Sequence, residues 1–244
     1  MKVDIRLVLD RSGSMSTVQQ DVIGGINKFF EDQRKVKGKA RVTMVQFDHN
    51  VTTVYVDEKL KNCEDLTDKT FTIGGMTALL DAFGQELKRD RREGYDKTVV
   101  VVFTDGYENA SHMYTRRDIA RLVKEREAQD WEFVFLGADI DAFGEAQDIG
   151  IASVNTINVS KSSQGFEAAY MSVSSNLAQT RAGTKADMSF EEADYEAQAR
   201  AGAHNPGTVK RDTKGSDSSG QQGDSSSKGQ LGTKADKGTE EGVS

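Results

Sequence analysis

The sequence predicts an α/β fold, a doubly wound and mostly parallel six-stranded sheet with one antiparallel edge strand and helices on both faces. Apolar strand-like runs alternate with segments of helical periodicity along most of the chain. Two β-rich runs are joined by only three turn-forming residues, 48–50, which predicts a hairpin and hence an antiparallel strand. The run 97–104 is nearly all apolar, which is typical of a central parallel strand buried on both faces.

The individual elements follow from the spacing of apolar residues. Short apolar or alternating runs predict strands over 3–9, 41–47, 51–56, 97–104, 131–136 and 153–159. Apolar residues at helical spacing predict helices over 18–37, 74–87, 115–128, 141–148 and 162–179. The carboxyl ends of the central strands are where such sheets bind ligands.

Composition divides the chain into three parts. The alternating pattern ends near residue 180, so we expect one α/β domain over 1–180. Ser189-Phe-Glu-Glu192 has the form of a capping box, which predicts a short helical extension within 181–200. Residues 201–244 are rich in Gly, Ser, Lys and Asp and poor in large apolar side chains, so we expect a disordered tail.

Charge and cysteine content limit the partners and the compartment. The net charge of −7 disfavours nucleic acid and anionic membranes, because both need clustered cations. Cys63 is the only cysteine, which excludes an intrachain disulfide and favours a structural thiol in a reducing compartment. The first strand begins at once and holds Asp4 and Arg6, unlike a signal peptide, and no apolar run is long enough to span a bilayer. We therefore expect a cytoplasmic protein; the oligomeric state is left open.

The first strand ends in a group of oxygen-bearing side chains. Asp10 closes the strand, and Ser12 and Ser14 follow at alternate positions of the next turn, which places three oxygens around one point. Hard divalent cations such as Mg²⁺ prefer such ligands. The alternative is that these are turn residues and that Ser14 or Ser16 caps the next helix.

Three segments are expected at the same rim of the sheet: residues 10–15, Gly74-Gly-Met-Thr-Ala-Leu79 and Phe103-Thr-Asp-Gly106. Together, in this order and spacing, they resemble the von Willebrand factor type A (VWA) domain and its metal-ion-dependent adhesion site (MIDAS), in a compact version such as bacteria and phages contain. The resemblance covers roughly residues 1–180 and implies a Rossmann-like fold.

The resemblance implies a set of metal ligands and a kind of partner. Asp10, Ser12 and Ser14 match the first MIDAS loop, Thr77 the second and Asp105 the third. The implied cofactor is Mg²⁺, or Mn²⁺ or Ca²⁺ in its place. One coordination position stays open in such sites, and a Glu or Asp of a partner protein fills it.

Three further residues lie near the motif. Tyr107 stands where many relatives carry a small or acidic residue, and with Glu108 it is expected at the rim, where both can touch a partner. Asp81 lies one helical turn after Thr77; it either orients the threonine loop or caps its own helix.

The sequence favours a non-enzymatic, metal-dependent protein-binding module, and two other functions are alternatives to it. In a Mg²⁺-dependent phosphohydrolase or phosphotransferase, Asp10 would be the nucleophile. Ser12 stands where such enzymes carry a second, acidic residue, which disfavours this hypothesis. In a scaffold, the closing helix and the tail would bind the partner instead of the metal site.

Overall fold

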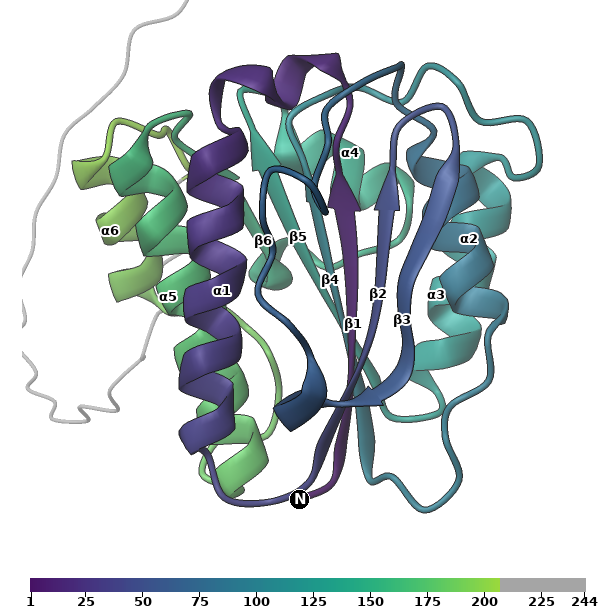
Figure 1. The fold of residues 1–244 in the computed structure, drawn as a ribbon, viewed down its shortest axis with the longest axis vertical. Coiled ribbons are helices and arrows are strands. Elements are labelled where there is room, and N and C mark those ends of the chain that lie inside the picture. The colour runs from purple at the N-terminus through teal and green to yellow at the C-terminus, as the bar shows by residue number, and fades with distance from the viewer. Residues whose placement is uncertain (207–244) are drawn as a thin grey trace, which may run out of the picture. The chain divides into compact units, whose positions relative to one another are not determined.

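Six strands form a single sheet in the order β3-β2-β1-β4-β5-β6 in the computed structural model, which describes residues 1–206 (Figure 1). The strands are β1 Val3–Asp10, β2 Ala40–Phe47, β3 Val51–Lys59, β4 Lys97–Thr104, β5 Trp131–Ala138 and β6 Thr156–Val159. All neighbouring strands run parallel except β2 and β3, which form the predicted hairpin. The doubly wound sheet with one antiparallel edge strand is therefore confirmed.

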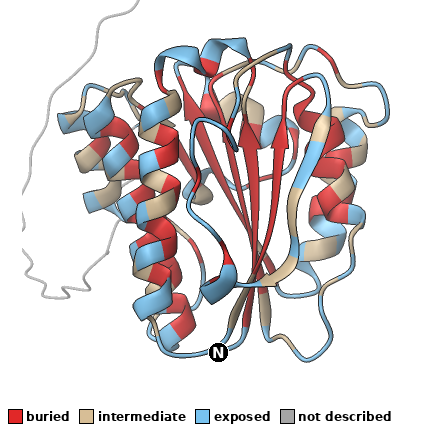
Figure 2. Ribbon diagram, viewed as in Figure 1, coloured by how far each residue is buried: buried red, intermediate tan, exposed pale blue. Residues whose placement is uncertain are grey.

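Helices cover both faces of the sheet. They are α1 Gln19–Lys35, α2 Leu79–Lys88, α3 Arg116–Glu127, α4 Ala142–Asp148, α5 Ser163–Ala182 and α6 Glu192–Arg200. Leu7 and Leu9 of β1 belong to the apolar core that α1 and α5 cover, whereas Val8 belongs to the core beneath α2, α3 and α4. Successive side chains of a strand point to opposite faces, so a strand buried on both faces becomes apolar throughout. Figure 2 shows the central strands buried over nearly their whole length; only the first residue of β4 is half-buried.

The strand order brings two predicted ligands to one edge. β1 pairs with β2 on one side and β4 on the other, and Leu9 of β1 lies opposite Phe103 of β4. The carboxyl ends of β1 and β4 are therefore adjacent, with Asp10 ending one strand and Asp105 following the other. The helix after β1 packs on one face and the helix after β4 on the other, so the crevice of this fold opens there.

Several element boundaries differ from the predictions. A 3-10 helix over Ser153–Asn155 replaces the first half of the last predicted strand. Helix α6 has a capping box, but its members are Glu191 and Asp194 rather than Ser189 and Glu192. Ser189 instead donates its hydroxyl to the carboxylate of Asp187, which removes it from the helix terminus.

The chain after α6 returns to the edge of the sheet. The side-chain amide of Asn205 accepts a hydrogen bond from the backbone N–H of Asn158 at 2.8 Å and donates to its carbonyl oxygen at 3.2 Å. Residues 201–206, at the start of the predicted tail, thus make defined contacts with β6. The rest of that tail, 207–244, lies outside the described residues. Among the helices of residues 1–206, none is both long and apolar enough to cross a membrane.

Candidate metal centre

Asp10 lies buried at the bottom of the candidate site. Its side chain is fully buried; Oδ1 accepts the backbone N–H of Ser12 at 2.7 Å, and Oδ2 accepts the hydroxyl of Thr104 at 2.5 Å. Burial raises the pKa of Asp10 to about 6, and the hydrogen bonds from Thr104 and Ser12 only partly offset this. A carboxylate that is desolvated to this degree is stabilised by a nearby cation.

The hydroxyls of the first loop connect Asp10 to the third loop. Ser12 Oγ lies 3.1 Å from Ser14 Oγ, and Ser14 Oγ donates to Asp105 Oδ1 at 2.5 Å. Ser12 and Asp105 are buried, whereas Ser14 is exposed. Two carboxylates and two hydroxyls thus lie close together at the carboxyl ends of β1 and β4.

Thr77 is held by backbone contacts between all three loops. Gly13 donates its N–H to the carbonyl of Gly75 at 3.1 Å, which fixes the second loop against the first. The Thr77 N–H donates to Asn109 Oδ1 at 2.9 Å, and the Thr77 carbonyl accepts the N–H of Asn109 at 3.0 Å. Thr77 is therefore held between two segments, the loop that follows β1 and the loop that follows β4.

Gly106 shows that the three hydroxyls surround one small space. A methyl group added to its Cα would lie 2.9 Å from Thr77 Oγ1, 3.4 Å from Ser14 Oγ and 3.7 Å from Ser12 Oγ. These side chains come from two loops, the first and the second, and their oxygens all lie near the same position beside the glycine of the third loop. A side chain there would fill the space that a cation needs.

A basic side chain reaches the site from the connection between β6 and α5. Lys161 Nζ lies 2.8 Å from Asp105 Oδ2 and donates to the carbonyl of Ser14 at 3.3 Å. Asp105 Oδ2 is buried and has no hydrogen bond of good geometry, so its contact with Lys161 is an ion pair without a well-directed hydrogen bond. The ammonium group is a positive charge at the place where the resemblance expects a metal.

These observations fit a divalent cation. The donors are carboxylate and hydroxyl oxygens, which hard cations prefer, and a lysine already supplies positive charge to one of them. The described part of the chain has no group of three or more His, Cys, Asp and Glu that could hold a metal. A site here therefore depends on the hydroxyls of Ser12, Ser14 and Thr77 in addition to the two carboxylates.

Asp81 organises a different loop from the one bearing Thr77. Its carboxylate accepts the backbone N–H groups of His112, Met113 and Tyr114 at 2.8–3.1 Å, and its own N–H donates to Ser111 Oγ at 3.0 Å. Its described side-chain hydrogen bonds thus all go to the segment after β4. Asp81 joins the first turn of α2 to that segment.

Tyr107 and Glu108 differ in what they offer to a partner. Tyr107 is 53% exposed, and its hydroxyl accepts the N–H of Asp141 at 3.2 Å. Both carboxylate oxygens of Glu108 are bonded within the protein, where they accept from the N–H of Leu80 and from Ser111 among others. The Glu108 carboxylate thus caps the first turn of α2 and shapes its own loop.

Sequence reasoning missed three residues that position the site: Thr104, Asn109 and Lys161. Thr104 lies inside the third motif and Asn109 three residues after it, so their polar side chains near Asp105 were the available signal. Lys161 gave no local signal, because only the strand order brings the β6–α5 connection to Asp105. The cap alternative for the first loop is wrong, since neither the 3-10 helix Gly13–Thr17 nor α1 has a side-chain cap.

Comparison with known proteins assigns the family. The family model of the von Willebrand factor type A domain matches residues 4–178. This match covers well over half of the chain, so the protein belongs to the VWA domain family. The search of curated proteins found no match.

Solved structures show the same fold at low sequence identity. Proximal thread matrix protein 1 from the mussel byssus, with a zinc-occupied MIDAS motif, has 18% identity and a TM-score of 0.57, over 72% of this chain and 46% of that one. The pilus adhesin SpaC from Lactobacillus rhamnosus GG, in its open conformation, has 14% identity and a TM-score of 0.58, over 73% and 30%. The vWF domain of the pilus tip protein Mfa5 from Porphyromonas gingivalis has 12% identity and a TM-score of 0.57, over 75% and 96%. The chain thus spans less than half of the mussel protein and most of the Mfa5 domain.

Proposed function

We propose that this protein is a non-enzymatic, metal-dependent protein-binding module. A divalent cation, Mg²⁺ in the first place, is held by Asp10, Ser12, Ser14, Thr77 and Asp105, and an Asp or Glu of the partner completes its coordination. The convergence of three hydroxyls around the space beside Gly106, one of them bonded to Asp105, is the observation that supports this most directly. A cation with only two charged ligands keeps part of its charge and attracts an external carboxylate.

The surroundings of the site favour a protein partner. Met76, Tyr107 and Met113 are 57%, 53% and 60% exposed, and they belong to the loops that follow one another around the ligands. Exposed methionine and tyrosine side chains are typical of protein interfaces, where they supply apolar contact area. The partner's acid would bind the metal, and these side chains would pack around it.

The environment of Asp10 disfavours the phosphohydrolase alternative. Both oxygens of its carboxylate accept hydrogen bonds and the side chain is fully buried. In an enzyme with an aspartate nucleophile, an acidic residue two positions on acts as the general acid. Ser12, the residue two positions on, donates its backbone N–H to Asp10 and offers no acid.

A cytoplasmic location belongs to this proposal. The single cysteine, Cys63, is buried, and its burial raises the thiol pKa to about 12, which gives an unreactive thiol. A reducing compartment suits such a residue.

The test measures metal binding and partner capture with one set of variants. Ser12→Ala/Ser14→Ala removes two hydroxyl ligands, and Ser16→Ala/Thr17→Ala removes two exposed hydroxyls from the same loop without touching the site. Isothermal titration with Mn²⁺ and capture of partners from host lysate, in Mg²⁺ and in EDTA, are compared with wild type. We expect the first variant to lose both metal binding and the Mg²⁺-dependent partner, and the second to keep both.

Two other results would refute the proposal. A partner retained equally in Mg²⁺, in EDTA and by Ser12→Ala/Ser14→Ala would favour binding through the closing helix α5 and the tail. Metal binding without any partner, together with hydrolysis of phosphate esters that Asp10→Asn abolishes, would favour the phosphohydrolase.

A further inference from the structure

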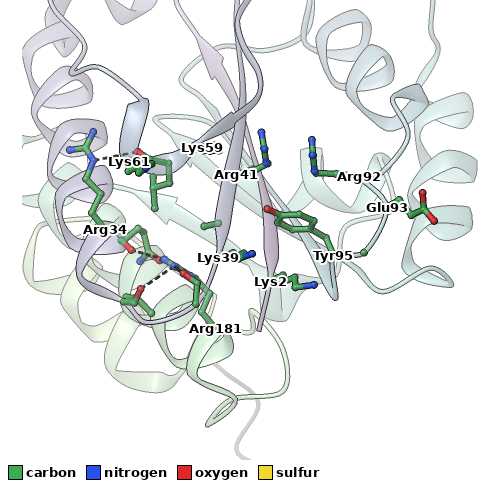
Figure 3. A pocket seen from close by; sticks show the side chains of 16 residues that line it. Lys2, Arg34, Lys39, Arg41, Lys59, Lys61, Arg92, Glu93, Tyr95 and Arg181 are labelled. Atoms are coloured by element: carbon green, nitrogen blue, oxygen red, sulfur yellow. Dashed lines mark hydrogen bonds between the residues drawn. The ribbon is translucent and has the colours of Figure 1, made fainter.

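A basic cavity lies near the amino ends of β1, β2 and β4, whereas the candidate metal centre lies at the carboxyl ends of the central strands. It has a volume of about 590 Å³ and is lined by the end of α1, the start of β2, the end of β3, the loop before β4 and the end of α5. Figure 3 shows its lining, with the ring of Tyr95 among the basic side chains. Small-molecule sites have volumes of roughly 300–1,000 Å³, so the cavity has the size of a ligand site.

The charge of the cavity is opposite to that of the whole chain. Eight of the sixteen lining residues are Lys or Arg, and Glu93 is the only acidic one, whereas the chain carries a net charge of −7. Like charges that are gathered in a concave space repel each other and raise the local potential. A general excess of cations does not explain this cluster, so its position needs another cause.

Four ammonium groups of the lining have no ionic partner among residues 1–206. They belong to Lys2, Lys39, Lys59 and Lys61, which are exposed at the cavity. The lysines that do form ion pairs among these residues are Lys28, Lys35, Lys97, Lys161 and Lys185. These four charges are therefore available to a ligand.

The arginines at the upper rim are only partly compensated. Arg41 and Arg92 share a single carboxylate, that of Asp57. Arg34 lies 3.7 Å from Asp65, which is itself 64% exposed. Three guanidinium groups thus face two carboxylates, which leaves positive charge at the rim.

Arg181 adds a buried charge without a carboxylate. The residue is 2% exposed, and its Nη atoms donate to Gln33 and to the carbonyls of Val36 and Gly38. Its Nε is buried and has no hydrogen-bond partner. A buried guanidinium next to carbonyls alone is costly, and an anion in the cavity it lines would compensate for it.

We propose that this cavity binds a small molecule that bears several phosphate groups. Multiple lysine and arginine charges around one concavity match a ligand with several negative charges, and lysine and arginine are the usual phosphate-binding side chains. The limited volume of about 590 Å³ favours a small ligand over an RNA strand, which needs a longer groove along its backbone. Tyr95 offers an aromatic surface for the ring of a nucleoside.

The experiment uses the full chain in EDTA, so that the metal centre does not contribute. Isothermal titration measures the binding of inorganic tripolyphosphate, ATP and inositol hexakisphosphate at two salt concentrations. Lys39→Ala/Lys59→Ala removes two charges of the cavity, and Lys69→Ala/Lys124→Ala removes two exposed charges elsewhere. All four lysines are exposed, so both variants should fold.

We expect at least one of the three probes to bind, at least tenfold more weakly to the cavity variant and within twofold of wild type to the control variant. Tyr95→Ala distinguishes the sources: it weakens ATP and leaves tripolyphosphate unchanged if the ligand is a nucleotide, and affects neither if it is not. Absence of binding by all three probes, or an equal loss in both lysine variants, would overturn the proposal. A single-stranded RNA oligonucleotide that binds more tightly than every probe and loses affinity in the cavity variant would overturn it in favour of RNA.

Discussion

The ammonium group of Lys161 lies 2.8 Å from Oδ2 of Asp105, a predicted metal ligand that is fully buried at its side chain. Lys161 follows Ser160, whose N–H donates to Oε1 of Gln198 in α6 at 3.1 Å. The lysine is thus held by an element that is anchored to the last described helix. Since a metal ion and an ammonium group cannot both lie against the same carboxylate oxygen at little cost, the two compete.

Replacing Lys161 with methionine is therefore expected to strengthen metal binding. The variant Lys161→Met keeps much of the apolar stem and removes the competing charge, so the affinity for Mn²⁺ should rise by about tenfold, equivalent to ~1.4 kcal/mol. Isothermal titration of wild type, Lys161→Met and the charge-conserving control Lys161→Arg would measure this. An affinity of Lys161→Met equal to or below that of wild type would contradict the competition.

Asp10 is expected to destabilise the metal-free protein at neutral pH. Its pKa is raised from 3.8 to about 6, so the folded protein binds a proton that the unfolded chain releases between about pH 4 and pH 6. The cost is thus complete above pH 6 and disappears below about pH 4. In EDTA at pH 7, Asp10→Asn should raise the free energy of unfolding by about 1–3 kcal/mol.

Urea unfolding of wild type and Asp10→Asn at pH 4 and pH 7, with and without Mg²⁺, measures this effect. The two proteins should be equally stable at pH 4. Excess Mg²⁺ should stabilise only the wild type, because the ion binds the folded state through this carboxylate. A variant that is less stable than wild type at pH 7 in EDTA would show that the hydrogen bonds of Asp10 outweigh its desolvation.

Gly106→Ala should abolish metal binding while leaving the fold intact. The new methyl group would lie 2.9 Å from Thr77 Oγ1 and enter the space between the hydroxyls. We expect the Mn²⁺ affinity to fall at least tenfold, with about 1 kcal/mol or less of lost stability. Gly24→Ala is the matched control, because nothing lies within 4 Å of its added methyl group. Unchanged affinity in Gly106→Ala would place the metal elsewhere.

Asp81→Ala should affect stability more than metal affinity. The substitution leaves three backbone N–H groups without an acceptor, those of His112, Met113 and Tyr114, which costs about 2–3 kcal/mol. Urea unfolding gives the loss, and titration with Mn²⁺ should give an affinity within a few-fold of wild type. A loss of affinity as large as that of Thr77→Ala at unchanged stability would instead assign Asp81 to the orientation of Thr77.

The sheet could be predicted from the sequence because it is encoded in local patterns, and the same kind of pattern carries the prediction of the ligand set. The apolar run at 97–104 indicated a central strand, which is β4. The short turn at 48–50 indicated the antiparallel pair of β2 and β3. Asp10, Ser12 and Ser14 lie within five residues of one another, so a motif describes them well. The structure joins the hydroxyls of Ser12 and Ser14 to Asp105, and their role as metal ligands stays a prediction.

Contacts between distant segments were beyond local patterns. The pairing of Lys161 with Asp105 and the support of Thr77 by Asn109 depend on strand order and loop packing. The prediction of the capping box was wrong for a different reason. Ser189 and Glu191 each have an acidic residue three positions later, so either could begin the same helix. The structure resolves this in favour of Glu191 because Asp187 binds the hydroxyl of Ser189.

The side-chain amide of Asn205 protects the edge strand β6 from pairing with another copy of the protein. It bonds to both the N–H and the carbonyl of Asn158, as the peptide group of a neighbouring strand would. β6 is the outermost strand on that side, so this amide blocks backbone groups that another chain would otherwise pair with. Asn205→Ala removes this cover without shortening the chain and leaves both backbone groups of Asn158 open to edge-to-edge pairing with another copy.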